Sequence, residues 1–107
     1  MMEYGTGYHR YYVYILTNKR RTVLYTGVTN NLHNRLLQHQ SKVNPDSFTA
    51  RYNVSYLIYY EKFEWIQKAI EREKEIKNLT RIKKLNLIRS ANPNLEFLNH
   101  LFRDFYG

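Results

Sequence analysis

The segment spanning residues 11–28 constrains the fold most strongly, because it has the pattern of two β-strands joined by a short polar connection. Aromatic and β-branched side chains dominate residues 11–16 and alternate between two faces, as in half-buried strands. The polar sequence TNKRRT follows, and residues 23–28 form a second apolar run. We therefore expect a hairpin, with Gly27 near its end, where a backbone can approach another group closely. The faces of the first strand should carry Tyr12, Tyr14 and Leu16 on one side and Tyr11, Val13 and Ile15 on the other.

Helical spacing of apolar residues accounts for much of the remaining chain. A short amphipathic helix is expected over residues 31–41, with N-cap candidates at residues 29–31. Residues 42–53 are predicted to be a loop, and the alternation over residues 54–60 predicts a third strand. Further helices are expected over residues 64–79, over residues 81–90 after an N-cap at Thr80, and at the C-terminus, where Leu95, Leu98, Leu101, Phe102 and Phe105 recur at helical spacing.

These elements predict an α+β fold, namely a small three-stranded antiparallel sheet flanked by helices, with an extra C-terminal helix. A chain of 107 residues has room for one domain, which we place at residues 11–107, after a flexible N-terminal tail over residues 1–10. No apolar run is long enough to span a membrane, and the N-terminus lacks the apolar segment of a signal peptide. We therefore expect a cytoplasmic protein.

The charge balance is the strongest compositional indication of a partner. The chain has 17 Lys and Arg against 9 Asp and Glu, a formal net charge of +8, and 11 tyrosines. A basic, tyrosine-rich domain suits nucleic acid, because bases stack on aromatic rings and phosphates attract cations. A basic protein without such a partner would have the same composition. The absence of cysteine excludes disulfides, zinc–thiolate sites, iron–sulfur clusters and cysteine nucleophiles.

Glu73 is an acidic residue in an apolar position. In the helix predicted over residues 64–79, it falls near the middle of the stripe formed by Ile66, Ala69, Ile70 and Ile76. A buried carboxylate is costly without a partner, so Glu73 is expected to meet a cation, a metal ion or hydrogen-bond donors. The alternative is a carboxylate at the edge of the stripe that reaches solvent or pairs with Lys77, four residues on.

Arg35 and His39 are four residues apart and share one face of the predicted helix over residues 31–41. A guanidinium offers a planar fork to a phosphate, and an imidazole can donate to phosphate or carry a proton near neutral pH. Tyr14 and Tyr25 lie in the predicted hairpin, where nearby cations can lower the pKa of a phenol. The alternative for Arg35 and His39 is an ordinary solvated helix face, and the alternative for Tyr14 and Tyr25 is aromatic packing between the two strands.

A basic stretch follows Glu73 and continues through the sequence RIKKLNLIR. It is interpreted either as a face that follows the phosphates of a nucleic acid or as an ordinary solvated helix face. The candidate nucleic-acid-binding residues on it are Lys74, Lys77, Arg81, Lys83 and Lys84.

Three segments, taken in their order along the chain, are more informative than any single residue: YVYIL at residues 12–16, LYTGVTNNLHNRLLQH at 24–39, and AIEREKEIK at 69–77. Together they resemble the GIY-YIG nuclease superfamily, in particular its small single-domain bacterial members. Those members in turn resemble the N-terminal nuclease domain of the excision-repair endonuclease C subunit. The first triplet is here Tyr-Val-Tyr and lacks the glycine, and the second is Tyr-Thr-Gly. Both tyrosines that carry the chemistry of the family are kept, so the substitutions bear on substrate fit more than on chemistry.

The resemblance implies a role for each candidate residue. Tyr14 would position or deprotonate the attacking water, and Tyr25 would support the nucleophile and the phosphate. Arg35 would stabilise charge on the scissile phosphate, and His39 would contact the phosphate or relay a proton. Glu73 would ligate one Mg²⁺ or Mn²⁺ ion, with water and a phosphate oxygen completing the shell. Asn86 is the match for an asparagine that orients the site.

The function expected from the sequence is metal-dependent endonucleolytic hydrolysis of DNA, structure-specific or non-specific, in DNA repair or recombination. The DNA could be branched, nicked or single-stranded, and no small-molecule cofactor or membrane is expected. One alternative is a nucleic-acid-binding module of the same fold with little or no catalysis. Another is an interaction protein whose basic face meets an acidic partner.

Overall fold

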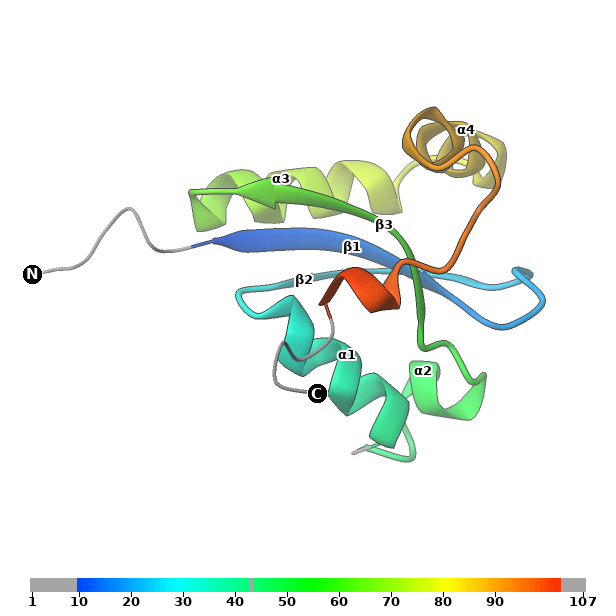
Figure 1. Cartoon of the computed structure of the whole chain (residues 1–107). Helices are drawn as coiled ribbons and strands as arrows, with labels where there is room; N and C mark the ends of the chain where they lie inside the picture. The colour runs from blue at the N-terminus through cyan, green and yellow to red at the C-terminus, as the bar shows by residue number, and fades with distance from the viewer. Residues whose placement is uncertain (1–9, 43, 103–107) are drawn as a thin grey trace, which may run out of the picture.

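Three antiparallel strands form the centre of the molecule, in the order β2-β1-β3 (Figure 1). This computed structural model describes residues 10–42 and 44–102 of the chain. The strands are β1 (Tyr11–Thr17), β2 (Leu24–Thr29) and β3 (Tyr56–Phe63). The helices are α1 (Leu32–Ser41), α2 (Phe48–Arg51), α3 (Ile66–Lys77), α4 (Arg81–Ala91) and the 3-10 helix η2 (Asn99–Phe102). The predicted three-stranded antiparallel sheet with flanking helices is therefore confirmed.

The two faces of the sheet carry separate hydrophobic clusters, because side chains of β1 alternate between them. Val13 and Ile15 pack with Ile76 of α3 and Ile88 of α4 on one face. Tyr14 belongs to the cluster on the other face, which includes Leu32 and Leu36 of α1. Figure 1 shows the same division, with α3 and α4 on one side of the sheet and α1 and α2 on the other. The predicted faces of the first strand are confirmed.

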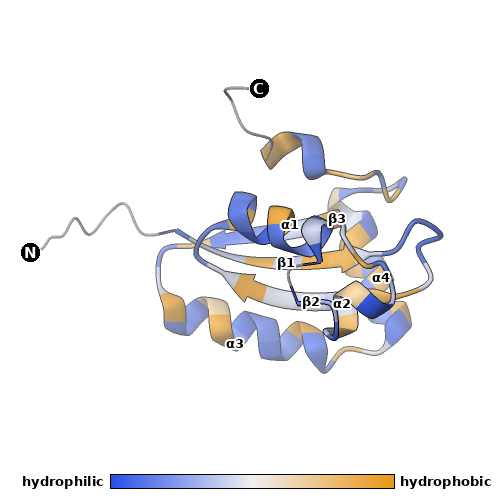
Figure 2. Cartoon of the chain, turned by 90° about the horizontal axis from the view of Figure 1, so that it is seen from below, coloured by the Kyte–Doolittle hydropathy of each residue, from blue (hydrophilic) through white to orange (hydrophobic). Residues whose placement is uncertain are grey.

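The helices begin where the sequence places their caps. The side chain of Asn31 accepts a hydrogen bond from the backbone N–H of Asn34 at 3.0 Å, and α1 starts at the next residue. Thr80 does the same for α4 through the N–H of Lys83. Figure 2 shows hydrophobic and hydrophilic residues along both α1 and α3, as expected for helices that bury one face. Among the described residues, no helix is long and apolar enough to cross a membrane.

The third strand differs from its prediction in both position and alternation. It spans Tyr56–Phe63 rather than residues 54–60, because the backbone N–H of Val54 donates to Thr49 and closes the preceding helical turn. An irregularity in the register with β1 leaves Ile58 out of the ladder, so Ile58 and Tyr59 both join the cluster on the α3 side. Such a bulge breaks the period of two.

Residues 42–53 were predicted to be a loop, and this prediction is wrong for α2. Ser47 caps this short helix, its side chain accepting a hydrogen bond from the N–H of Ala50 at 3.2 Å. Thr49 and Ala50 are buried, whereas Phe48 is 47% exposed. Four residues make barely one turn, so no apolar periodicity could reveal the helix.

The expected C-terminal helix is present only as the 3-10 helix η2, because side-chain contacts hold this segment against the sheet. The Asn92 amide donates to the carbonyls of Ile58 and Glu96, which turns the chain after α4. The Asn99 side chain accepts from the N–H of Leu57 and donates to the carbonyl of Ser55. Phe105 and residues 1–9 of the predicted N-terminal tail lie outside the described residues.

Candidate active site

Tyr14 is the centre of the candidate site. It lies on β1 with none of its surface exposed and is paired with Gly27 of β2 in the ladder. A Cβ atom on Gly27 would lie 2.5 Å from both Cζ and Oη of the Tyr14 phenol. Gly27 therefore leaves room for the Tyr14 ring over the backbone of β2. The close approach expected near the end of the hairpin is this contact.

His39 lies between Tyr14 and the short helix α2. Its Nε2 atom is 3.3 Å from the Tyr14 hydroxyl, and its Nδ1 atom is 2.9 Å from Oγ1 of Thr49. Burial, together with the Arg35 guanidinium, lowers the pKa of His39 below its usual 6.5, so the ring is neutral at pH 7. A neutral ring that donates from Nδ1 to Thr49 presents Nε2 as the acceptor for the Tyr14 hydroxyl.

Thr49 is a functional residue that the sequence analysis missed. It is only 5% exposed, and its hydroxyl also lies 3.3 Å from Oγ of Ser47. Because a threonine in a predicted loop carries no pattern, nothing local indicated its contact with His39. The contact follows from α2, whose buried side turns Thr49 toward the last turn of α1.

The pKa of Tyr14 is raised to about 12, whereas nearby cations alone would lower it. Burial is the main cause, and the neighbouring Tyr25 and Glu73 also raise it, whereas the Arg35 guanidinium lowers it. Desolvation of the phenolate outweighs the attraction of the Arg35 cation. Tyr14 is therefore protonated at neutral pH. The electrostatic interactions of Tyr25, Arg35 and Glu73 thus all act on the Tyr14 hydroxyl.

A pocket of about 240 Å³ opens beside this cluster, between β2, α1 and α2. Tyr25 and His39 line it, and the buried Tyr14 ring packs against both, with centroids 5.9 to 6.4 Å apart among the three rings. The pocket is lined by Tyr25, Arg35, Gln38, His39, Lys42, Asn44, Ser47, Phe48, Thr49 and Ala50. The structure thus brings together the four residues that the sequence marked as catalytic.

Glu73 lies at the edge of the buried face of α3, not at its middle. Ala69 and Ile76 are fully buried, whereas Ile66 and Ile70 are more than a third exposed. The Glu73 side chain is 15% exposed and lies 3.1 Å from Nζ of Lys77. The pairing with Lys77 is thus the alternative that the sequence left open.

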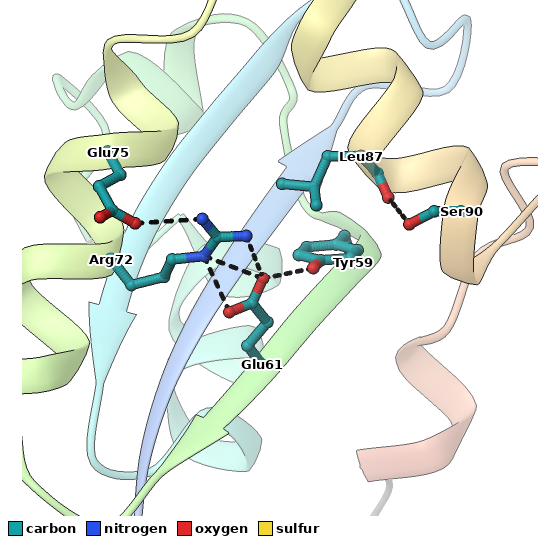
Figure 3. Close-up of polar contacts among 6 residues, drawn as sticks. All are labelled: Tyr59, Glu61, Arg72, Glu75, Leu87 and Ser90. Carbon is teal, nitrogen blue, oxygen red and sulfur yellow. Dashed lines mark hydrogen bonds and ion pairs between the residues drawn. The ribbon is translucent and has the colours of Figure 1, made fainter.

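The neighbouring residue, Arg72, fixes how α3 lies on the sheet (Figure 3). Its guanidinium donates to both carboxylate oxygens of Glu61 on β3, at 3.0 and 3.2 Å from Nε, and to Glu75 at 3.1 Å. Tyr59 also donates to Glu61. Arg72 and Glu73 are about 100° apart around the helix. Glu73 instead contacts Lys77, and its charge is the smallest of the influences on the pKa of Tyr14.

The basic candidates and Asn86 lie on α3 and α4, the side of the sheet that also carries Glu73 and that is opposite to α1 and α2 (Figure 1). Lys74, Lys77, Arg81 and Lys83 are exposed on α3 and α4, and Lys84 is half-buried. Asn86 is exposed on α4, which contacts β3, the strand at the far edge of the sheet from β2. The structure therefore does not bring Asn86 to the pocket.

The described residues hold no group of three or more His, Asp or Glu side chains arranged to bind a metal ion. Glu73 is the carboxylate whose charge acts on the pKa of Tyr14. Mg²⁺ often binds through one or two carboxylates, and its remaining ligands are water and substrate phosphate. A single carboxylate therefore fits a hydrated divalent ion, but not a closed cage of protein ligands.

Comparison with known proteins agrees with this geometry. The model of the GIY-YIG catalytic domain matches residues 10–86. The UPF0213 protein CPE1444 of Clostridium perfringens is 46% identical over 81 residues, which cover 76% of this chain and 85% of that protein. The UPF0213 protein NP_0776A of Natronomonas pharaonis is 37% identical over 78 residues, or 73% of this chain and 89% of that protein.

A solved structure shows the same fold. The solution structure of the UPF0213 protein BH0048 from Bacillus halodurans superimposes with a TM-score of 0.53 at 30% identity. The match covers 85% of this chain and 93% of that one. The chain therefore belongs to the GIY-YIG family, and within it to the small UPF0213 proteins. The domain implies a nuclease family, a nucleic acid substrate and the divalent metal ion that GIY-YIG nucleases generally use.

Proposed function

We propose that this chain is an endonuclease that uses Mg²⁺ or Mn²⁺ to hydrolyse phosphodiester bonds in DNA, in a structure-specific or non-specific manner, during repair or recombination. The observation that carries the proposal is a pocket lined by Arg35 and His39, with the Tyr14 hydroxyl 3.3 Å from Nε2 of His39. The charges of Arg35 and Glu73 both act on this hydroxyl. A positioned water, a proton acceptor and a cation for phosphate charge are the groups that such hydrolysis needs.

Arg35 stabilises the phosphate in this proposal. It lines the pocket with Tyr25, and its guanidinium can meet two phosphate oxygens at once. A fixed cation at that position interacts more strongly with the transition state, where negative charge accumulates, than with the bound diester. The Tyr25 hydroxyl supports the nucleophile and the phosphate.

Tyr14 and His39 form a path for the proton of the attacking water. Tyr14 is a neutral phenol at pH 7, so its oxygen orients the water while its O–H points to Nε2 of His39. As the water attacks phosphorus, its proton passes to the Tyr14 oxygen, and the phenolic proton passes to neutral His39. Thr49 holds the tautomer of His39 that can accept this proton.

Glu73 would hold the metal ion, with water and a phosphate oxygen as its other ligands. When bound, the ion polarises the phosphoryl oxygen and stabilises the leaving group. Lys77 would then release the Glu73 carboxylate, which it contacts at 3.1 Å in this structure. Lys77 is 51% exposed, so its ammonium can turn to solvent or to DNA.

The same ion pair favours a second candidate function, a DNA-binding module of the GIY-YIG fold without catalysis. A Glu73 that stays paired with Lys77 is not available to a metal ion. The test is incubation of the purified chain with plasmid and branched DNA in Mg²⁺, Mn²⁺ or EDTA. Strand scission in either metal but not in EDTA supports the endonuclease, and binding without scission in all three supports the module.

The exposed cations of α3 and α4 are proposed to bind DNA phosphates away from the pocket, through Lys74, Lys77, Arg81, Lys83 and Lys84. Phosphate contacts release counterions, so the logarithm of the binding constant should fall linearly and steeply with the logarithm of the salt concentration. An acidic protein partner, the remaining alternative, lacks this counterion atmosphere and would give a shallower dependence.

A further inference from the structure

A strip of aromatic rings leads from the pocket to solvent. The rings of Tyr25 and Phe48 are stacked, with centroids 6.2 Å apart and planes at 23°. The ring of Tyr52 follows, with its centroid 4.8 Å from that of Phe48. We refer to Phe48 and Tyr52 as the aromatic strip. It begins at a wall of the pocket that holds Arg35 and His39.

The strip is not explained by packing within the chain. Phe48 is 47% exposed and Tyr52 is 49% exposed, although full burial of such a side chain typically stabilises a fold by about 1.5–3 kcal/mol. The buried side of α2 consists instead of Thr49 and Ala50. Because α2 turns its largest side chain outward, next to the pocket, the strip is available to a ligand of that pocket.

The charges around the strip indicate the chemistry of this ligand. The Arg51 guanidinium lies 5.9 Å from the centre of the Tyr52 ring, and Lys42 lines the same pocket as Phe48. Rings next to cations match a ligand that alternates flat apolar faces with negative charges. Single-stranded nucleic acid has this character, since its bases expose their faces and its backbone carries phosphates. In a duplex, the bases cover each other's faces.

We infer that Phe48 and Tyr52 stack an unpaired base beside the phosphate held at the pocket, so that the preferred ligand is single-stranded DNA or a single-stranded segment within a branched molecule. This inference rests on the proposed function, because it takes the pocket to be the phosphate site. It adds the substrate class: the base next to the scissile phosphate must be unpaired.

The test is binding of fluorescent oligonucleotides in EDTA, where cleavage plays no part. Three ligands of equal strand length are compared: an oligothymidylate, the same strand with abasic residues in place of the bases, and a DNA duplex of that length. The two single strands carry the same number of phosphates, so they differ only in their bases, whereas the duplex carries about twice as many. The wild-type chain should prefer the oligothymidylate over the abasic strand by about five-fold or more, the effect of one stacked base.

Phe48→Ala and Tyr52→Ala should lose this preference for bases while binding the abasic strand and the duplex as the wild type does. Phe48→Trp should keep it, because it retains a stacking ring. Trp65→Ala is the matched control, since Trp65 is a 68% exposed aromatic residue at the start of α3, outside the pocket. Melting curves confirm that each variant is folded.

Two outcomes overturn the inference. One is a wild-type chain that binds the abasic strand as tightly as the oligothymidylate, and the other is an equal loss of affinity for all three ligands in both alanine variants. Failure of the proposed function is separate: it appears as no hydrolysis of any DNA in Mg²⁺ or Mn²⁺, with the base preference in EDTA unchanged.

Discussion

Gly27 lies directly across the β1–β2 ladder from Tyr14, and its missing side chain provides the space that the Tyr14 phenol occupies. An added Cβ atom would lie 2.5 Å from Cζ of Tyr14, far inside the 3.5–4.0 Å at which carbon atoms attract one another. Gly27, the last residue of the second triplet, is therefore required because any side chain there would clash with Tyr14 of the first triplet. It allows the hydroxyl of Tyr14 to reach His39.

Gly27→Ala is expected to displace the Tyr14 ring and to reduce cleavage by about 10²-fold, the effect of a misplacement of about 1 Å. Overpacking should also lower the free energy of unfolding by about 1–3 kcal/mol. Val28→Ala is the control, because Val28 packs on the opposite face of the sheet. It should lower stability without a comparable loss of single-turnover rate. Wild-type cleavage by Gly27→Ala would show that the close contact has no role.

Glu73→Gln is expected to abolish cleavage in Mg²⁺ and to leave the fold intact. The pair with Lys77 links residues four apart on a helix, and such a pair contributes about 0.2–0.5 kcal/mol, so the melting temperature should change little. Glu71→Gln is the matched control, since Glu71 is 65% exposed and lies 3.8 Å from Lys68. The metal assignment is wrong if Glu73→Gln cleaves DNA as well as Glu71→Gln does.

Tyr14→Phe and Arg35→Ala are each expected to reduce the single-turnover rate by at least about 10²–10³-fold, as loss of one electrostatic stabiliser does. The double variant should lose far less than the product, because both groups act in one step. Affinity for uncleaved DNA should fall more for Arg35→Ala, which removes a charge. If Tyr14 serves only in packing, Tyr14→Phe will melt slightly lower and cleave normally.

The pKa of His39 sets an acid limit for both cleavage and stability. This pKa is lowered from 6.5, chiefly by burial, so unfolding raises the affinity of the ring for a proton. The free energy of unfolding contributed by neutral His39 is present above pH 6.5 and is lost as the pH falls toward the lowered value. Cleavage should fall over the same range. A His39→Gln variant should show a smaller acid-induced decrease in melting temperature.

Thr49→Val tests the hydrogen bond between Thr49 and His39. The substitution keeps the shape of the side chain and removes the hydroxyl that holds the His39 ring. It should lower kcat with little change in KM, and Thr49→Ser should restore the rate. A purely structural Thr49 would instead change the melting temperature and leave kcat unchanged in the folded protein.

Lys83→Ala combined with Lys84→Ala tests the basic face of α4. The double variant should bind DNA more weakly, about equally across sequences, and its salt slope should be shallower by up to about 2. Filter binding or anisotropy over a range of salt concentrations measures the slope. An unchanged slope would remove both lysines from the interface and leave the pocket side of the molecule as the binding face.

The sequence was informative wherever local patterns and tertiary structure agree. Alternation over residues 11–16 predicted the two faces of β1, and Asn31 and Thr80 began the helices as their cap positions indicated. The four candidate catalytic residues also meet in space. These features depend on single residues with strong local preferences, or on a motif order that the family shares.

The sequence was less informative where contacts between distant residues override the local pattern. The bulge at Ile58, the helix α2 and the short η2 all depend on partners elsewhere in the chain. The same holds for the pKa of Tyr14, because burial by residues elsewhere in the chain outweighs the charge of Arg35. The position of Asn86 also depends on the path of α4, which no spacing along the chain could give.

The segment that carries Leu98 and Asn99 has a consequence for self-association. The N–H of Leu98 donates to the carbonyl of Leu57 at 2.7 Å, while the Asn99 side chain binds the N–H of Leu57 and the carbonyl of Ser55. These groups lie along the outer edge of β3, where a strand from another molecule could otherwise add to the sheet. By occupying them, a few residues protect this edge against the intermolecular strand pairing that leads to aggregation.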